Sequence, residues 1–216
     1  MQSSGPNESA ARKTLVWLTP EVQAREMRGV NAKPFRGSYY RRQDSDATTI
    51  IQGTKSHTGP TDILYLRQMI QSGFRRVIIF TTGAKVNEND SIAWVVVSDH
   101  INLSGQNPLI GENDSRTGPR FPDMTHLYNP ELNRQLLSCF EKMGLSVAPG
   151  VALIPCPGHP RIEPEWQSRL IAICRCMAPQ LMLPAIVARH AGAEVGAVVG
   201  FGPAPEKYIT SLCELR

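Results

Sequence analysis

The chain has 216 residues, 41% of them hydrophobic, which is enough for one domain of ordinary size with its own core. Its 23 Lys and Arg residues against 19 Asp and Glu residues give a net charge of +4, a modest basic surplus. No apolar run approaches the roughly 20 residues that a membrane-spanning helix requires, so the composition argues against a helical membrane protein.

The cysteines are odd in number, and the chain shows no secretory signal peptide. We therefore expect reduced thiols in a cytoplasmic protein. Cys174 and Cys176 form a C-x-C pair without a second pair, which is a poor zinc site. We expect no bound metal.

The N-terminal part of the chain is polar and then basic. The first dozen residues are small and polar, and we expect them to be disordered. Residues 13–18 (KTLVWL) predict a short strand or the end of a helix, and Pro20 permits a helix over residues 21–28. Residues 33–42 (KPFRGSYYRR) have the aromatic and basic composition of a nucleic-acid platform. No recognisable nucleic-acid-binding fold accompanies them, so we favour a solvated basic surface.

Regular elements begin near residue 47. Asp62 is placed to cap a helix over residues 62–72, and Gly73 to end it. Apolar β-branched runs predict strands on both sides of this helix, which indicates a parallel pair with a right-handed crossover. The strands expected in this part are residues 48–52, 76–81 and 92–97.

Strands and helices continue to alternate further along the chain. Residues 129–143 predict an amphipathic helix that has Pro130 at its first position and Gly144 at its end. The alternation predicts an α/β fold with a mainly parallel sheet. The other elements expected here are a strand over residues 151–155, a helix over 164–177, a short helix or helix end over 186–190 and a strand over 194–201.

Between these two parts, residues 98–124 are rich in polar, Gly and Pro residues and are too long for an ordinary connection. Long ordered loops of this kind are usually functional or make contacts between subunits. Asp99, His100 and Asn102 are expected at the exit of the preceding strand, where α/β sheets place their ligand crevices.

The wording of this stretch, DHINLSGQNPLIGENDSRTGPRFPDM, closely resembles a segment of the trimeric purine nucleoside phosphorylases, which reads DHINL, GQNPL, GPND and RFP with a Met shortly after. Residues 183–190 (LPAIVARH) resemble the VPEVIVARH of that family with one residue deleted. The resemblance implies a phosphorylase-type mixed, mainly parallel central sheet flanked by helices. It implies a phosphorylase-like domain over residues 47–216, without the usual first phosphate loop and C-terminal helix, behind a variable, partly disordered basic arm over residues 1–46.

The family transfers ribose from a purine nucleoside to phosphate, so the resemblance implies phosphate as co-substrate and no other cofactor. Residues 52–57 (QGTKSH) resemble the phosphate-binding QGR-x-H pattern with one residue inserted, so His57 carries over. Lys55 stands only loosely for the Arg, because an ammonium lacks the bidentate fork of a guanidinium. Thr82 stands where the family's NAAGG stretch supplies a backbone donor.

For the nucleoside, the resemblance implies Glu163 as the residue that hydrogen-bonds the base, with Ile162 where the family has its stacking aromatic ring. Gly202 and Pro203 replace the Thr-Asn pair whose side chain donates to the purine. Phe121 matches the aromatic that family members insert into the site of a neighbouring subunit; a ring packed in its own core is the alternative.

Two functions of different class follow. The first is a purine nucleoside phosphorylase-like pentosyltransferase of purine salvage, with weakened or lost activity, acting on purine nucleoside and phosphate as a cytoplasmic homotrimer. The second is a catalytically inactive family member that binds a ligand or serves as an oligomeric interaction protein.

Overall fold

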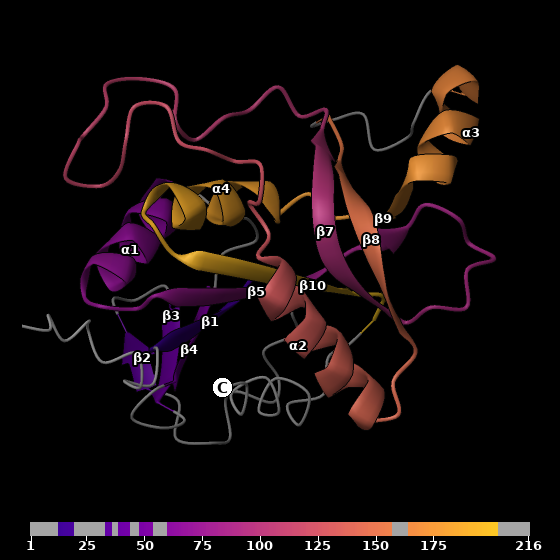
Figure 1. Ribbon diagram of the computed structural model, residues 1–216, viewed down its shortest axis with the longest axis horizontal. Coiled ribbons are helices and arrows are strands. Elements are labelled where there is room, and N and C mark those ends of the chain that lie inside the picture. The colour runs from indigo at the N-terminus through magenta and orange to yellow at the C-terminus, as the bar shows by residue number, and fades with distance from the viewer. Residues whose placement is uncertain are drawn as a thin grey trace, which may run out of the picture.

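The computed structural model describes residues 13–19, 33–35, 39–43, 48–53, 60–156 and 164–202. Within them one mixed sheet has the strand order β2-β3-β4-β1-β5-β10-β7-β8-β9-β6, and helices flank it (Figure 1). The strands are β1 (Thr14–Leu18), β2 (Lys33–Phe35), β3 (Tyr39–Gln43), β4 (Thr48–Gly53), β5 (Arg76–Thr82), β6 (Ala84–Lys85), β7 (Trp94–Asn102), β8 (Val147–Ile154), β9 (Cys174–Met177) and β10 (Glu194–Gly200). The helices are α1 (Pro60–Gln71), α2 (Pro130–Lys142), α3 (Pro164–Ile173) and α4 (Met182–His190).

The centre of the sheet is parallel. Strands β4, β1, β5 and β10 run in one direction, β7 joins β10 in the opposite direction, and parallel pairing resumes through β8 and β9. Strands β2 and β3 add an antiparallel edge. The predicted α/β fold with a mixed, mainly parallel sheet flanked by helices is confirmed.

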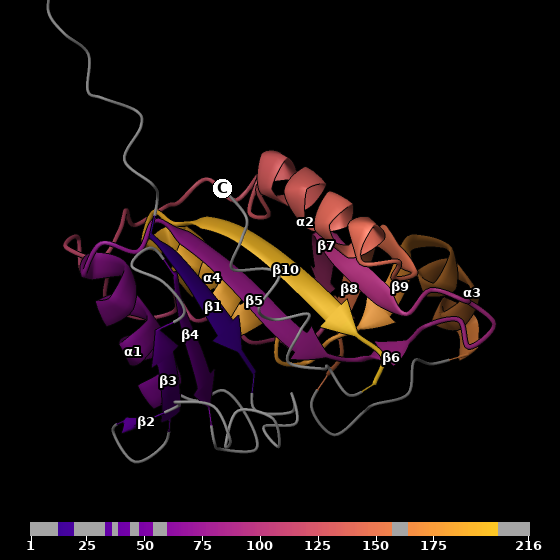
Figure 2. The same ribbon diagram turned by 90° about the horizontal axis from the view of Figure 1, so that it is seen from below.

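The sheet curls back on itself next to the end of β5. Only Gly83 separates β5 from β6, and β6 pairs with β9 at the far edge of the strand order. In Figure 2 the arrowheads of β5 and β10 end beside β6. A Cβ atom on Gly83 would lie 2.3 Å from the carbonyl oxygen of Met177, so a residue without a side chain is needed where the curl closes.

The two faces of the sheet carry separate cores, because successive side chains of a strand point to opposite faces. Helices α1 and α4 cover one face, on which Trp17 and Ile79 are buried. Helix α2 covers the other, where Phe80 and Trp94 pack with ring centroids 5.4 Å apart. The sheet is therefore buried on both sides, as parallel sheets generally are.

Helix α2 forms where its local sequence predicts it. Pro130 stands in its first turn, and the side-chain oxygen of Asn129 accepts a hydrogen bond of 2.9 Å from the backbone N–H of Leu132. Its apolar side chains at helical spacing, Leu132, Leu136 and Phe140, are buried on the sheet.

Several predicted boundaries are wrong: α1 begins at residue 60 and not 62, β8 at 147 and not 151, and α4 at 182 and not 186. The helix expected over residues 164–177 ends at Ile173, and the next four residues form β9 because β8 and β6 supply hydrogen-bonding partners there. Strand β7 continues to Asn102, since β8 pairs with it over that length. Asp99, His100 and Asn102 therefore belong to the strand itself and not to its exit.

The sheet also extends upstream of residue 47. Residues 13–18 contain β1, which lies between β4 and β5, so the two strands joined by α1 are parallel but are not direct neighbours. The basic segment over residues 33–42 contributes β2 and most of β3. The expected helix over residues 21–28 lies outside the described residues. In the described part of the chain, no helix is long and apolar enough to cross a membrane.

Candidate functional site

The carboxyl ends of β1, β5 and β10 meet at one edge of the sheet. There the buried Thr19 hydroxyl donates to the Thr81 hydroxyl at 2.8 Å, and Thr81 donates to the carbonyl oxygen of Thr82 at 3.3 Å. The hydroxyl groups of Thr19 and Thr81 therefore hydrogen-bond to each other and to the backbone of Thr82. These contacts fix the position of Thr82 at the end of β5. Such edges are where α/β sheets bind ligands.

Thr82 presents a backbone donor to this edge. Hydrogen bonds run from Thr19 N–H to the Phe80 carbonyl on one side of β5, and from Gly83 N–H to the Gly200 carbonyl on the other. Since backbone groups alternate along a strand, the N–H of Thr82 points to the β1 side, beyond the last residue of that strand. No hydrogen bond from it to another described residue is present. The position predicted for a phosphate donor is thus a half-buried residue whose N–H has no acceptor among the described residues.

A cation and a ring lie next to this edge. The Lys85 ammonium is 5.6 Å from the centroid of Phe201, the residue that follows β10, and donates to the backbone carbonyl of Asp90. Gly202 follows with φ +150°, where the family resemblance expects a side chain that contacts the purine.

The other phosphate residues predicted from the sequence, Lys55 and His57, lie outside the described residues. Strand β4, which leads to them, pairs with β1 in a register that sets Gln52 beside Leu18. It therefore ends at the same edge as Thr82.

The predicted base-binding residues, Ile162 and Glu163, also lie outside the described residues, immediately before α3. Strand β9, which follows α3, ends at Met177. The carbonyl oxygen of Met177 lies close to Gly83, next to the end of β5. The structure thus describes β8 before this segment and α3 and β9 after it, whereas the roles of Ile162 and Glu163 in binding the base stay a prediction.

Phe121 is not part of this edge. Its side chain is 88% exposed, with the Arg120 guanidinium 5.9 Å from the ring centroid, so the alternative of a core ring is wrong. Its loop is tied to the end of α4 by a 3.0 Å contact between His190 Nε2 and the Pro119 carbonyl. That point lies beside the start of β10, whereas Thr82 pairs with its last residue. At about 3.3 Å per residue, the length of β10 from Glu194 to Gly200 is about 20 Å.

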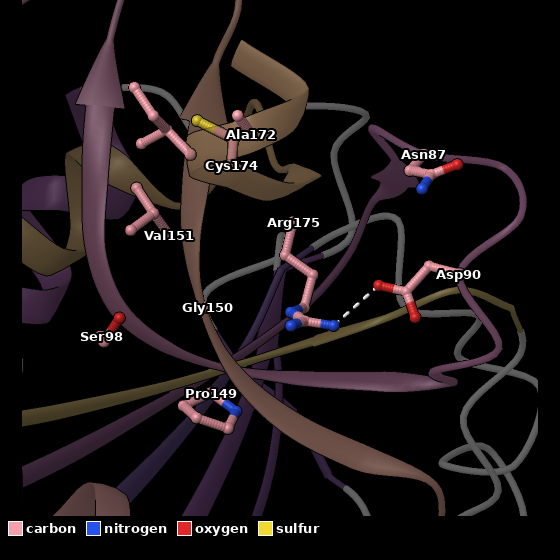
Figure 3. A pocket seen from close by; sticks show the side chains of 10 residues that line it. Asn87, Asp90, Ser98, Pro149, Gly150, Val151, Ala172, Cys174 and Arg175 are labelled. Atoms are coloured by element: carbon pink, nitrogen blue, oxygen red, sulfur yellow. Dashed lines mark hydrogen bonds and ion pairs between the residues drawn. The ribbon is translucent and has the colours of Figure 1, made fainter. Parts of the chain in front are cut away.

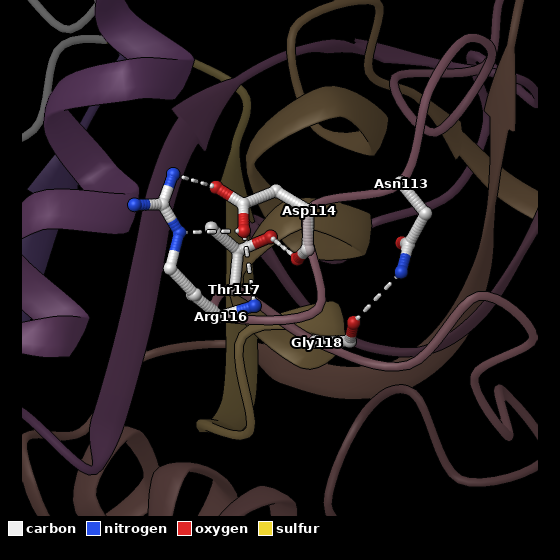
Figure 4. Close-up of polar contacts among 5 residues, drawn as sticks. All are labelled: Asn113, Asp114, Arg116, Thr117 and Gly118. Carbon is white, nitrogen blue, oxygen red and sulfur yellow. Dashed lines mark hydrogen bonds and ion pairs between the residues drawn. The ribbon is translucent and has the colours of Figure 1, made fainter.

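The loop that carries Phe121 is ordered by its own side chains (Figure 4). Arg116 donates to both carboxylate oxygens of Asp114, at 2.9 and 2.8 Å, and the Thr117 hydroxyl donates to the Asp114 carbonyl at 2.8 Å. The hydrogen bonds from Arg116 lower the pKa of Asp114 to about 2. Asn113 spans the turn by donating to the Gly118 carbonyl at 3.3 Å. Residues with this many internal bonds form a fixed surface loop.

His100 makes a structural contact that the sequence did not reveal. Its Nδ1 lies 3.0 Å from the Tyr128 hydroxyl, and the two rings meet edge to face with centroids 5.8 Å apart. Burial lowers the pKa of His100 and raises that of Tyr128. A neutral His100 therefore ties β7 to the chain that leads into α2, and nothing in its sequence neighbourhood indicates this partner.

Titratable side chains do not gather into a metal site. Among the described residues, no group of three or more His, Cys, Asp or Glu side chains could hold a metal ion. Among the described cysteines, Cys174 and Cys176 are buried free thiols.

Comparison with known proteins points in one direction. No family model matches the chain. It is 35% identical over 133 residues to purine nucleoside phosphorylase 1 of Geobacillus stearothermophilus, which covers 60% of this chain and 48% of that protein. It is 32% identical to the purine nucleoside phosphorylase of Anopheles gambiae over 45% of this chain and 29% of that protein, and 30% identical to that of Mus musculus over 57% and 45%. The chain thus spans about half the length, or less, of these curated relatives.

The fold leads to the same group of proteins. The crystal structure of purine nucleoside phosphorylase from Schistosoma mansoni in complex with acetate matches with a TM-score of 0.73 at 19% identity, over 94% of this chain and 90% of that one. The Schistosoma protein in complex with guanosine matches with a TM-score of 0.72 at 20% identity, over the same shares.

Proposed function

Because the chain belongs to the purine nucleoside phosphorylase family, we propose that the edge formed by the ends of β1, β4, β5 and β10 binds phosphate and a purine nucleoside. The proposed reaction is that of the family: purine nucleoside and phosphate give the free base and ribose 1-phosphate. The observation that carries the proposal is the backbone N–H of Thr82, which points beyond the end of β1 at this edge and has no acceptor among the described residues.

The phosphate would be held by backbone and cationic donors. The N–H of Thr82 gives one hydrogen bond, and the Thr19–Thr81 pair fixes the backbone around it. Lys55 and His57, in the segment that follows β4, would supply the charge. A phosphate oxygen then attacks C1′ of the ribose while the bond from C1′ to the purine nitrogen breaks, and its electron pair leaves with the base.

The proposed site has few groups to stabilise the departing purine. Glu163 would hold the base and Ile162 would pack against it. Gly202 offers no side-chain donor to the nitrogen that gains charge, and loss of one such transition-state contact commonly lowers a rate by about 100-fold or more. We therefore propose weakened or absent phosphorolysis.

The proposal includes a homotrimer in the cytoplasm. Phe121 is exposed on an ordered loop that contacts the end of α4, whereas Thr82 pairs with the last residue of β10, so the ring would complete a site in another copy of the chain. An exposed ring on a fixed loop costs little entropy to bury in an interface, which supports this role.

A second candidate is an inactive family member that binds a nucleoside or a partner without turnover. Two observations favour it: the hydroxyl groups of Thr19 and Thr81 are used internally, and Gly202 has no side chain. Fold and surfaces would then be retained without the groups that act in the transition state.

The test is release of free base from inosine and guanosine, with and without phosphate, combined with thermal shift by the same nucleosides. Release that needs phosphate and falls at least tenfold in Glu163→Ala, but not in the matched control Glu165→Ala on the exposed surface of α3, would establish the enzyme. Stabilisation by nucleosides without release would establish the second candidate. If neither occurs, the chain neither cleaves nor binds these nucleosides, and only the binding of a partner is left of the second candidate.

A further inference from the structure

A hollow of about 420 Å³ lies away from the Thr82 edge, between β8, β9, the last turn of α3 and the turn that follows β6 (Figure 3). Its volume is within the range of small-molecule sites. One wall is apolar and another carries polar groups. The apolar lining is Pro149, Val151, Ala172 and Ile173, and the polar lining includes Asn87, Asp90, Ser98 and Arg175.

Arg175 is held in place from two sides. Its aliphatic stem lies on Gly150, where an added Cβ would be 2.8 Å from Arg175 Cβ and 3.1 Å from Cδ. One nitrogen of its guanidinium donates to Asp90 Oδ2 at 2.8 Å, the contact drawn in Figure 3. Because Arg175 is the second residue of β9, the strand also fixes its backbone. A guanidinium held in this way loses little freedom when it binds a ligand.

Asp90 orients Arg175 but does not use up its donors. Its other carboxylate oxygen accepts from the backbone N–H of Ile92 at 3.1 Å, so both oxygens of Asp90 are occupied. The guanidinium makes no further hydrogen bond to a described residue, and the Arg175 side chain is 37% exposed. Lys85 on the adjoining β6 donates to the Asp90 carbonyl and adds a second positive charge nearby.

Two further donors face the hollow. The side-chain oxygen of Asn87 accepts a hydrogen bond of 3.1 Å from the backbone N–H of Asn89. The side-chain NH₂ group of Asn87 is not used in this contact and can donate to a ligand in the hollow. Ser98 is exposed on β7. Among the described residues of the lining, the one carboxylate is that of Asp90, which is already paired with Arg175.

We propose that this hollow is a second ligand site, which takes a small molecule with an oxyanion head, a carboxylate or a phosphate monoester, on a compact apolar body. The head binds the open side of the Arg175 fork, with Asn87 as a neutral donor, while Ser98 lines the opposite side of the hollow. The body packs against Val151, Ala172 and Ile173. A planar guanidinium suits carboxylate and phosphate because it can donate two parallel hydrogen bonds.

The test uses the full ¹⁵N-labelled chain and NMR titration with benzoate and phenyl phosphate, with benzyl alcohol and inorganic phosphate as probes that lack the charge or the ring. We expect saturable shifts of the amides of Asn87, Ser98 and Gly150 with both aromatic anions, and at least tenfold weaker binding there of benzyl alcohol and of inorganic phosphate. Shifts at Thr82 instead would report the phosphate edge and would overturn the proposal, as would equal binding of benzyl alcohol. Whichever of benzoate and phenyl phosphate binds more tightly shows whether the site prefers a carboxylate or a phosphate head.

Variants locate the charge. Arg175→Gln should weaken benzoate at least tenfold, while Arg134→Gln, which removes a guanidinium from an exposed ion pair with Glu131 on α2, should leave it unchanged. Ser98→Ile, which narrows the hollow without touching the ion pair, should also weaken both anions. Equal affinity in Arg175→Gln and the wild type would overturn the proposal. If Arg175→Gln does not fold, Ser98→Ile and the uncharged probe decide the question in the same way.

Discussion

The packing of α2 on β10 offers a prediction that can be worked out from the coordinates. Gly196 of β10 faces α2, and an added Cβ would lie 2.8 Å from Leu136 Cδ1 and 2.9 Å from Leu132 Cδ2. Leu136 is fully buried. The helix therefore lies on the sheet at a distance that only glycine allows, and α2 holds the strand that ends at the proposed nucleoside edge.

Single changes on either side should destabilise the fold. Gly196→Ala overpacks the contact at a cost of about 1–3 kcal/mol, against a gain of roughly 0.4–1 kcal/mol from the less flexible unfolded chain. Leu136→Ala leaves a cavity that costs about 2–5 kcal/mol. In the double variant the new methyl group enters the space of the lost leucine. The combined cost should then fall short of the sum by at least about 0.5 kcal/mol.

The measurement is urea unfolding followed by the fluorescence of Trp94, which is buried 5.4 Å from the ring of Phe140 under α2. The control pair is Gly196→Ala with Leu15→Ala, because Leu15 belongs to the core on the opposite face of the sheet and should be additive. Additivity of Gly196→Ala and Leu136→Ala within about 0.3 kcal/mol would refute the reasoning.

Three further predictions concern charge, a buried hydrogen bond and assembly. The carboxyl group of Asp114 should titrate near the pKa of about 2 that Arg116 imposes and should return toward 3.8 in Arg116→Gln, as followed by NMR. Tyr128→Phe should cost about 1–3 kcal/mol in thermal unfolding, because it leaves His100 Nδ1 without its partner. Phe121→Ser should lower the mass measured by light scattering from that of a trimer toward that of a monomer.

The signs and controls of these predictions follow from the same contacts. The folded-state pKa of Asp114 lies below 3.8, so its contribution to loop stability is present above that pH and is lost as pH falls through about 2. The pKa of His100 is lowered, so stability should decline as pH drops below 6.5, where the unfolded histidine takes up a proton. Ile110→Ser, at another exposed apolar side chain of the same loop, is the control for assembly. Equal loss of the trimer in both variants would show that Phe121 has no special role.

The sequence by itself determined the elements whose signals are local. Pro130, the apolar residues at helical spacing and Gly144 lie within about fifteen residues, so the helix and its amphipathic face were predicted correctly. Strand β5 and strand β10 followed from unbroken apolar runs. The amino-acid sequence of the loop predicted the family, because such a resemblance depends on residue identity alone.

The tertiary structure decided what depends on partners far along the chain. Residues 174–177 continue a helical pattern without a breaking residue, and only pairing with β8 and β6 makes them a strand. The exposure of Phe121 depends on how its loop docks on α4, and the role of His100 on Tyr128. Thr82 is the clearest case. A motif predicted it as a phosphate donor, but its N–H lacks a described acceptor only because β1, which lies more than sixty residues earlier, ends beside Phe80.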